Sequence, residues 1–463
     1  MEFGEWSKLA LLYIIHNLLL AQCIVRLETK LGRIKGTHMY SRDGRKFHAF
    51  LGVPFAEPPI GELRFQNPKP ITEPWLGTLD ATQYPPLCPQ FLGTLGFLGE
   101  EDCLYLNVYT PFLPNTTNSN TKLPVWVWIY PGRRLFGDTH PYHYGPEYIM
   151  DKPVVFVCAN YRMNVVGFFS TEDDSASGNY GLKDQSAALQ WIQNHISEFG
   201  GDPTNVTISG ESSGAVDVGL HLVSPLSKGL FHRAIAQSGH AMNYRAVVTS
   251  GQNLRRAWEF AKLVGCKSAA IISSESLVEC MRNVPIRMLT INMYGLMYDH
   301  ILPHTFFGIN IEKEHTEGAF ITEHPMINMN KNNSVPWMLG INTDEGSQKL
   351  LGVIHGEELK CLFNQPRIFP PILDGPDRKI SDLIINFWYN FVAFGDPNGR
   401  RKLKTWKPVS SPNIEYLYIS ETVSEMRSNP CWDEYNFWKS IGSPPLLKPD
   451  VSLQLFKDSK NFH

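Results

Sequence analysis

Ser212 is the residue of this chain whose setting most clearly suggests covalent chemistry. It stands in Gly210-Glu211-Ser212-Ser213-Gly214, which fits the pattern G-x-S-x-G. A serine hydroxyl becomes an effective nucleophile when a neighbouring base removes its proton. Glycines on both sides permit a turn tight enough to expose the hydroxyl. The pattern therefore predicts a nucleophile, and the alternative is an ordinary Gly/Ser turn.

The segments on either side of Ser212 predict the context that such a nucleophile needs. The branched residues Val206, Thr207 and Ile208 indicate a short buried strand. Residues 215–222 are typical of a helix. A serine on a sharp turn between strand and helix is a nucleophile elbow, and the helix directs its N-terminal N–H groups at the same point.

Other segments predict the architecture that holds this elbow. Apolar runs at 125–130, 154–160 and 335–340 are typical of strands buried on both faces. Helical spacing occurs at 183–199 and 380–394. Alternating buried strands and helices predict an α/β fold with a mostly parallel central sheet and helices on both faces.

Composition limits the function classes. The chain has 463 residues, 43% of them hydrophobic, and a formal net charge of -3. This allows a large core, and near-neutral charge without basic runs argues against nucleic acid as a partner. Neither C-x-x-C nor H-E-x-x-H spacing occurs, so we expect no metal, and no pattern suggests a cofactor.

The N-terminus carries an apolar run from Leu9 to Ala21. It is shorter than the ~20 residues of a membrane span and fits the core of a signal peptide. We expect residues 1–23 to be a signal peptide and 24–463 the secreted domain, with no membrane span after cleavage. A buried helix or an uncleaved anchor is the alternative. Glycosylation sequons occur at Asn115 and Asn332. A third opens the elbow strand at Asn205, where burial is expected to prevent modification.

The eight cysteines fit an oxidising compartment. Two pairs bracket short loops, and we predict the disulfides Cys88–Cys103 and Cys266–Cys280. Cys158 lies in an apolar strand and is expected to be a buried thiol. Cys23 is expected to leave with the signal peptide, and the pairing of Cys361 and Cys431 stays open.

At this point the chain resembles the type-B carboxylesterases, the esterase and lipase group that includes cholinesterases and insect esterases. The most specific evidence is E-D-C-L-Y-L-N-V-Y at 101–109 together with the G-E-S-x-G elbow. Residues 145–148 and 317–320 look most like insect juvenile-hormone-esterase-like and venom carboxylesterases. Further similar blocks are F-L-G-V-P-F-A at 50–56, N-Y-R at 160–162, G-N-Y-G-L-K-D-Q at 178–185, F-G-G-D-P at 199–203 and D-E-G at 344–346.

This resemblance implies an α/β-hydrolase that cleaves small carboxylic esters through an acyl-enzyme. Ser212 matches the nucleophile, His355 the general base and Glu345 the acid that orients the histidine. The chain order Ser, Glu, His is that of the α/β-hydrolases. Ser238 matches a supporting hydroxyl near the acid. The alternatives are a solvated turn acid at Glu345 and a surface histidine at 355.

The first departure from the family lies in the oxyanion hole. Where the family has H/Y-G-G-G-F, this chain has Tyr-Pro-Gly-Arg-Arg at 130–134. The resemblance assigns the backbone donors to Gly132, Arg133 and Ser213. Pro131 has no N–H, and the Cβ of Arg133 restricts a backbone that glycine leaves free. Because losing one donor costs ~10²–10³ in turnover, we expect a weakened esterase.

The second departure is the ten-residue spacing of Glu345 and His355. In this fold the acid and the histidine follow different strands, and returning through a helix and a strand takes roughly 30 residues. We therefore predict that a segment is missing between about 346 and 352, and with it a late core strand. Reach is not the obstacle, since ten residues span up to ~33–36 Å.

Two functions remain open. The first is a secreted carboxylesterase with reduced activity, and the second is a catalytically inactive esterase-like binding protein. The set Ser212, Glu345 and His355 favours the enzyme, whereas the altered glycine run favours the binding protein. The ester substrate and the oligomeric state are not readable from the sequence.

Overall fold

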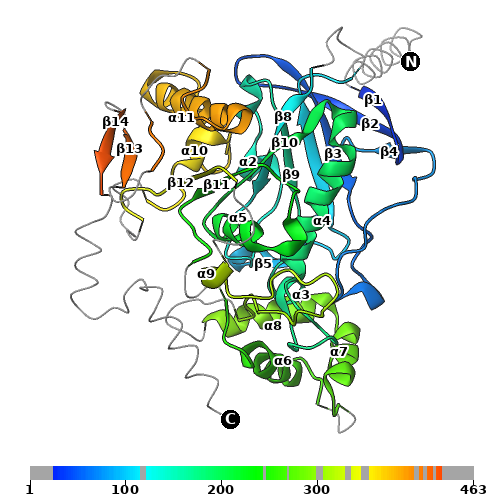
Figure 1. Ribbon diagram of the computed structural model, residues 1–463. Helices are drawn as coiled ribbons and strands as arrows, with labels where there is room; N and C mark the ends of the chain where they lie inside the picture. The colour runs from blue at the N-terminus through cyan, green and yellow to red at the C-terminus, as the bar shows by residue number, and fades with distance from the viewer. Residues whose placement is uncertain are drawn as a thin grey trace, which may run out of the picture. The chain divides into compact units, whose positions relative to one another are not determined.

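The structure is a computed structural model (Figure 1). It describes residues 24–114, 121–242, 247–267, 271–298, 306–328, 335–345, 354–400, 406–409, 414–420 and 424–429. The expected signal peptide (1–23), the sequons at Asn115 and Asn332, and the segment 346–352 lie outside these residues. The chain divides into two compact units, Met1–Asp396 and Pro397–His463.

A ten-stranded sheet dominates the first unit. Its order is β1-β2-β3-β7-β9-β8-β10-β11-β12, with β4 pairing with β2. A separate small sheet pairs β5 with β6. The strands are β1 (Ile24–Thr29), β2 (Gly32–Tyr40), β3 (Lys46–Pro54), β4 (Thr78–Asp80), β5 (Gln90–Leu92), β6 (Gly96–Leu98), β7 (Tyr105–Thr110), β8 (Leu123–Ile129), β9 (Val155–Ala159), β10 (Gly201–Glu211), β11 (Arg233–Gln237) and β12 (Trp337–Gly340).

The helices of this unit connect the strands or extend beyond the sheet (Figure 1). The α-helices are α2 (Pro141–Tyr144), α3 (Asn164–Phe168), α4 (Tyr180–His195), α5 (Ser213–Val223), α6 (Gln252–Leu263), α7 (Ser274–Asn283), α8 (Ile286–Tyr298), α9 (Pro325–Asn328), α10 (Leu359–Leu362) and α11 (Gly375–Phe394). Single 3-10 turns are η1 (Gly61–Leu63), η2 (Gly93–Leu95), η3 (Ile149–Asp151), η4 (Ile196–Phe199) and η5 (Pro225–Ser227).

The sheet is mixed, and its parallel half carries the elbow. Strands β9, β8, β10, β11 and β12 pair in parallel, whereas β1, β2, β3, β7 and β9 pair antiparallel. Short connections join β1, β2 and β3, and short connections allow antiparallel neighbours. The expectation of a mostly parallel sheet therefore holds for the half that supports Ser212.

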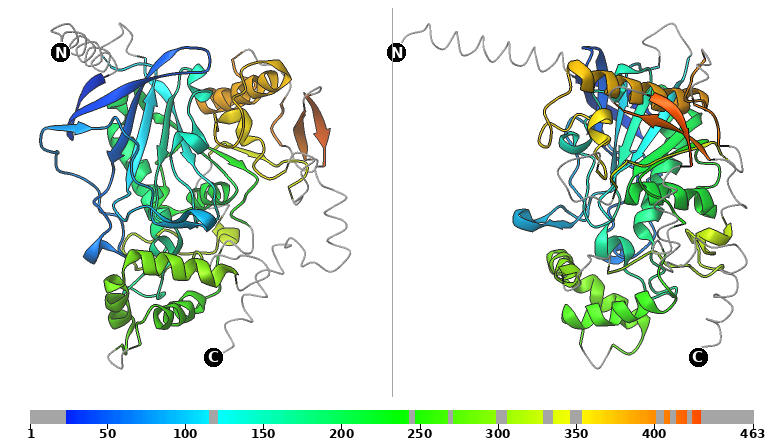
Figure 2. Two further views of the ribbon diagram at one scale, coloured as in Figure 1. Left: turned by 180° about the vertical axis from the view of Figure 1, so that it is seen from behind. Right: turned by 90° about the vertical axis from the view of Figure 1, so that its left-hand side faces the viewer.

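Helices pack against this parallel half, as Figure 2 also shows. On β10, Thr207 Oγ1 donates to the carbonyl of Val392 on α11 at 3.5 Å. Side chains alternate along a strand, so Val206 and Ile208 point to the opposite face, and both are fully buried. Helices α4 and α5 also contact β10. The central strands are thus buried on both faces, as their apolar runs predicted.

Strand β12 is the last strand on its side of the sheet within the described residues. Its pairing with β11 runs from Trp337 to Gly340. Leu339 on β12 is 50% exposed, and Ile341, just after the strand, is 59% exposed. Exposed apolar side chains on an edge strand are usually covered by another strand, a helix or a loop. The missing late strand stays a prediction that this exposure supports.

A second apolar cluster holds α6, α7 and α8 together. Phe260, Leu277, Met281 and Leu289 are fully buried in it. The predicted disulfides Cys88–Cys103 and Cys266–Cys280 are confirmed, and the second joins the end of α6 to α7. Cys158 is a buried thiol, as predicted, and among the described cysteines Cys361 is one as well.

The second unit contains one described hairpin, β13 (Glu415–Ile419) with β14 (Ser424–Ser428), paired antiparallel. Within the described residues of the whole chain, no helix has both the length and the hydropathy that crossing a bilayer requires.

The disulfide between α6 and α7 gives a prediction about stability. Replacing both partners, Cys266→Ala with Cys280→Ala, should lower the free energy of unfolding by about 3 kcal/mol, because a loop of this length gains about that much from cross-linking. Urea unfolding followed by fluorescence measures the change. An unchanged midpoint would contradict the prediction.

Candidate active site

Ser212 occupies a strained turn between β10 and α5. Its φ of 53° and ψ of −120° lie in a region that non-glycine residues rarely adopt. The turn is held because the N–H of Ser212 donates to the carbonyl of Gln237 at 2.9 Å. Strain of this kind persists where the surrounding structure enforces it, and it clusters at functional sites. The predicted elbow is present.

Close backbone contacts explain the two glycines of the motif. A Cβ on Gly210 would lie 2.5 Å from the carbonyl carbon of Gly214. A Cβ on Gly214 would lie 2.2 Å from the carbonyl oxygen of Ile129, the last residue of β8. Both distances are below any real Cβ contact. The elbow therefore presses against the end of the neighbouring strand, and only glycine fits there.

Ser213 is the first residue of α5. The first N–H groups of a helix have no acceptor within the helix. The Ser213 hydroxyl is buried and has no hydrogen-bond partner in the described part of the chain. The backbone N–H of Ser213, an expected donor, lies next to Ser212 at the positive end of the helix dipole.

Glu345 follows β12, and two groups fix its carboxylate. Ser238 Oγ, just after β11, donates a hydrogen bond to Glu345 Oε1. The same oxygen accepts from the N–H of Asn342 at 2.8 Å. The carboxyl ends of parallel strands meet at one sheet edge, and here the N–H of Ser238 also donates to the carbonyl of Gly340 at 2.8 Å. The structure thus brings Ser238 and Glu345 together.

His355 Nδ1 lies 2.6 Å from Glu345 Oε2. The chain reaches this position within ten residues of the acid. The other ring nitrogen, Nε2, lies 3.2 Å from Glu211 Oε1. This approach is within ion-pair range, yet it does not meet hydrogen-bond geometry, since Glu211 Oε1 has no hydrogen-bond partner among the described residues.

Ser212 and His355 are not hydrogen-bonded to each other in the part of the chain that the structure describes. The structure therefore brings Glu345, His355 and Ser238 together, and Ser212 directly follows Glu211, the residue that Nε2 approaches. Catalytic hydrogen bonds are often long or poorly aligned in ligand-free enzymes.

Three carboxylates surround the imidazole. The hydrogen bond to Glu345 is the largest influence and raises the pKa of His355 above 6.5; nearby carboxylate charges, including that of Glu211, act in the same direction against burial. Burial raises the pKa of Glu211 to about 8, although the positive charge of His355 opposes the rise. Burial also acts to raise the pKa of Glu345, but hydrogen bonds from His355 and Ser238 outweigh it and lower the value.

Sequence reasoning missed three residues that complete this cluster. Glu358 Oε1 accepts from Gln237 Nε2 at 3.0 Å, and its Oε2 accepts from Asn342 Nδ2 at 2.5 Å. Burial raises the pKa of Glu358. A carboxylate three residues after a candidate base was the available signal for Glu358. Nothing in the local sequence marks Gln237 or Asn342.

The loop after β8 has a shape that the sequence did not predict. Gly132 has a φ of 120°, and a Cβ there would lie 1.9 Å from the carbonyl oxygen of Phe136. Arg133 and Arg134 both adopt left-handed backbone conformations, with φ of 59° and 60°. Each such non-glycine residue costs roughly 1–2 kcal/mol. The Arg133 residue is exposed, whereas Arg134 turns inward.

The N–H groups of Gly132 and Arg133 are available in this loop. The carbonyl of Gly132 accepts from the N–H of Leu135 at 3.0 Å and from that of Phe136 at 3.3 Å. Within the described chain, neither the N–H of Gly132 nor that of Arg133 has an acceptor. The arrangement leaves two donors free at the end of β8, the strand next to the elbow strand.

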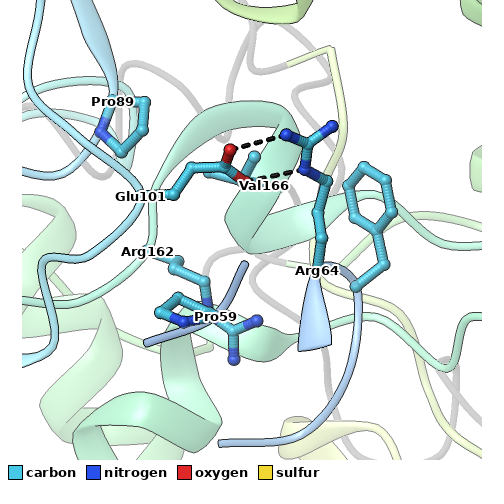
Figure 3. Close-up of a pocket in the computed structure, with 7 residues that line it drawn as sticks. Pro59, Arg64, Pro89, Glu101, Arg162 and Val166 are labelled. Atoms are coloured by element: carbon cyan, nitrogen blue, oxygen red, sulfur yellow. Dashed lines mark hydrogen bonds and ion pairs between the residues drawn. The ribbon is translucent and has the colours of Figure 1, made fainter. Parts of the chain in front are cut away.

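A separate hollow is filled by an ion pair and does not form a binding site. It is lined by Pro59, Arg64, Phe65, Pro89, Glu101, Arg162 and Val166. Figure 3 shows Arg64 paired with Glu101 across it, with Nη2 2.5 Å and Nε 2.7 Å from the carboxylate oxygens. Arg64 Nη1 also donates to the carbonyls of Arg282 and Val284. These contacts tie the N-terminal part of the chain to α7 and leave no space for a ligand.

The cluster around His355 gives a prediction about its ionisation. Glu345→Gln should lower the pKa of His355, because the hydrogen bond to the carboxylate is the largest cause of its rise. Titration of the ring by NMR measures the value. Glu357→Gln is the control, since Glu357 accepts from Ile354 and Lys360 rather than from His355. Equal shifts in both variants would contradict the assignment.

Comparison with known proteins agrees with this architecture. The model of the carboxylesterase family matches residues 23–351 and 347–438. Juvenile hormone esterase of Tribolium castaneum is 40% identical over 342 residues, covering 73% of this chain and 57% of that protein. A carboxylic ester hydrolase of Bombus ignitus is 36% identical over 434 residues, covering 90% and 75%. Venom carboxylesterase-6 of Apis mellifera is 35% identical over 435 residues, covering 90% and 75%.

The match to several relatives covers only part of them. It spans 57%, 61% and 60% of the juvenile hormone esterase and of two Myzus persicae esterases. The family model nevertheless covers most of this chain. With the elbow, the mixed sheet and these matches together, the chain belongs to the carboxylesterase family of α/β-hydrolases.

Proposed function

We propose that this chain hydrolyses small carboxylic esters through an acyl-enzyme, with Ser212 as nucleophile, His355 as general base and Glu345 as the orienting acid. The observation that carries the proposal is the contact of His355 Nδ1 with Glu345 at 2.6 Å, beside an elbow that presents Ser212. With Nδ1 held by the carboxylate, Nε2 is the nitrogen left to accept a proton.

The reaction follows from these positions. Ser212 Oγ attacks the ester carbonyl carbon while its proton passes to His355 Nε2, giving a tetrahedral oxyanion. The imidazolium, stabilised by Glu345, then gives that proton to the leaving alkoxide, and the C–O bond breaks. Water repeats the sequence on the acyl-serine and releases the carboxylic acid.

The oxyanion is stabilised by backbone donors at Gly132, Arg133 and Ser213. Such donors act when they are fixed before the reaction begins. The free N–H groups of Gly132 and Arg133, and the position of Ser213 at the start of α5, support this assignment.

We further propose that turnover is slow compared with relatives that have three glycines in this loop. Nε2 of His355 faces Glu211 at 3.2 Å and must turn from it toward Ser212 Oγ before it accepts the proton. The His355 side chain is 44% exposed, so few contacts hold the ring in the productive orientation.

A missing segment between about 346 and 352 accounts for this loose support. Two observations favour it. The family match falls into two pieces that meet at 347–351. The match to the Bombus ignitus hydrolase covers 90% of this chain but only 75% of that relative. Sequencing the transcript between the codons of Glu345 and Gly352 tests the deletion, and an unbroken genomic reading frame there would oppose an exon-skipped origin.

Secretion is part of the proposal. An N-terminal signal at 1–23 fits the two disulfides, which persist in oxidising compartments. Sugar at Asn115 and Asn332 is expected on the same grounds. Asn205 is a poor acceptor, because its side chain is engaged with Arg233 and with the carbonyl of Ala393.

The second candidate is an inactive esterase-like binding protein. The approach of His355 Nε2 to Glu211 instead of Ser212 favours it. Covalent capture of the serine separates the two functions, since a fluorophosphonate reacts only with an activated hydroxyl.

For the enzyme we predict fluorophosphonate labelling of the purified full chain at Ser212. Ser212→Ala should abolish it, and His355→Ala should slow it by at least about 10²-fold, the lower range of a general base contribution. Intact-mass and peptide mass spectrometry locate the label. Ser250→Ala, at an exposed serine outside the site, is the matched control. An unlabelled wild-type chain supports the binding protein.

The pH dependence of labelling follows from His355. Only the neutral imidazole accepts a proton, so the rate should rise with pH through the pKa of His355, with a midpoint above 6.5. Glu345→Gln should move this midpoint to lower pH while lowering the plateau. A wild-type midpoint below 6.5 would show that the ring is not held by its carboxylates.

A further inference from the structure

The loop after β8 contains two consecutive non-glycine residues in left-handed conformation, Arg133 and Arg134. In such a conformation the Cβ approaches the backbone too closely, and glycine is the usual occupant. Two adjacent strained residues persist only where other contacts enforce them. The contacts that could do this here come from Arg134.

Arg134 is anchored to α5, the helix that begins beside Ser212. Its Nε donates to Asp217 Oδ1 at 2.7 Å, and its Nη2 lies 2.6 Å from the same oxygen. The side chain of Arg134 is 12% exposed and that of Asp217 is fully buried. The backbone is held as well, since the carbonyl of Arg134 accepts from the N–H of Asn164 at 2.7 Å.

Asp217 is itself held rigidly. Its second oxygen, Oδ2, accepts from Gln185 Nε2 on α4 at 2.8 Å. Gln185 Oε1 lies 2.8 Å from His221 Nε2 on α5. Both carboxylate oxygens are therefore engaged, and the acceptor of the Arg134 guanidinium is also held from α4.

The anchor lies one residue beyond the candidate donor. Arg133 stands between Arg134, fixed by Asp217, and Gly132, whose carbonyl accepts from Leu135 and Phe136. The Arg133 N–H belongs to the same planar peptide group as the Gly132 carbonyl, so the hydrogen bonds to that carbonyl also fix the direction of the N–H. Exposure of the Arg133 residue leaves its side chain outside this packing.

We propose that the buried Arg134–Asp217 pair positions the loop after β8, which carries the candidate oxyanion donors, against α5. The pair enforces the left-handed backbone that glycines would adopt without strain. This inference rests on the proposed esterase function for its catalytic consequence. The mechanical part, that the pair holds the loop, stands on the contacts alone.

Asp217→Asn tests the device with the smallest change. Asparagine keeps the size and an acceptor oxygen but removes the charge that binds Arg134. Amide hydrogen exchange of a peptide covering 131–137 should become faster by at least about tenfold, which corresponds to a weakly held turn. Fluorophosphonate labelling of Ser212 should fall by about 10²–10³-fold, the effect of a lost oxyanion donor.

A second variant separates positioning from stability. Arg134→Met with Asp217→Asn removes both buried charges while the amide oxygen can still accept from Gln185 Nε2, and removing both partners of a buried ion pair is often neutral or stabilising for the fold. The double variant should melt near the wild-type temperature and still show fast exchange and slow labelling. Glu101→Gln is the matched control: it breaks the charge of another buried pair, Arg64–Glu101 (Figure 3), and should leave exchange at 131–137 unchanged.

Each outcome decides a separate claim. If wild type is labelled and both Asp217→Asn and the double variant keep wild-type exchange and labelling, the positioning role is wrong. Faster exchange with unchanged labelling would limit the pair to holding the loop and overturn its catalytic consequence. If wild type is not labelled, the proposed function fails, and the exchange rates alone then judge whether the pair holds the loop.

Discussion

The site depends on the close approach of two backbones at the ends of β8 and β10. The elbow presses so tightly on Ile129 that only glycine fits at position 214. This contact, together with the hydrogen bond from the Ser212 N–H to the carbonyl of Gln237, holds Ser212 in its strained conformation and sets the start of α5 beside the end of β8. The Ser212 turn, the N-terminus of α5 and the start of the loop after β8 thereby converge, and this loop carries two N–H groups that have no acceptor among the described residues. Parallel pairing of the two strands, Gly210 opposite Ile129, is the reason for the convergence.

The ionisation of the carboxyl groups near His355 depends on their burial. Glu211, Glu345 and Glu358 all influence His355, and burial favours the neutral form of Glu211 and of Glu358. A neutral Glu211 holds the imidazole less strongly than a carboxylate would. The attraction between Glu211 and Nε2 is therefore weaker than the 3.2 Å approach alone suggests. Burial of Glu211 therefore weakens the contact on the Nε2 side of the ring, while Glu345 holds the Nδ1 side.

The sequence predicted the parts of this site that short motifs encode. The elbow was expected from its strand–turn–helix pattern, and both disulfides from the spacing of their cysteines. The contact of Glu345 with His355 was expected only because the chain resembles the type-B carboxylesterases. Gln237 and Asn342 were not expected, since they act through contacts between loops that only the sheet order brings together. The inward turn of Arg134 was missed for the same reason: its partner lies 83 residues away in the chain.

The altered glycine run has a structural consequence that the sequence did not predict. From the sequence, arginine at 133 and 134 indicated only a restriction on the loop. In the structure, the restricted backbone at Arg133 and Arg134 lowers the entropy that the loop loses when it is fixed. A glycine loop samples many conformations and loses entropy when it is fixed, whereas two arginines already held in left-handed conformation have little left to lose. The strain is then offset by the buried contact of Arg134 with Asp217 and by the hydrogen bond from Asn164. A departure from the family pattern is thus compatible with a preorganised loop, and the weaker point of the site is the imidazole, which the chain supports from one side.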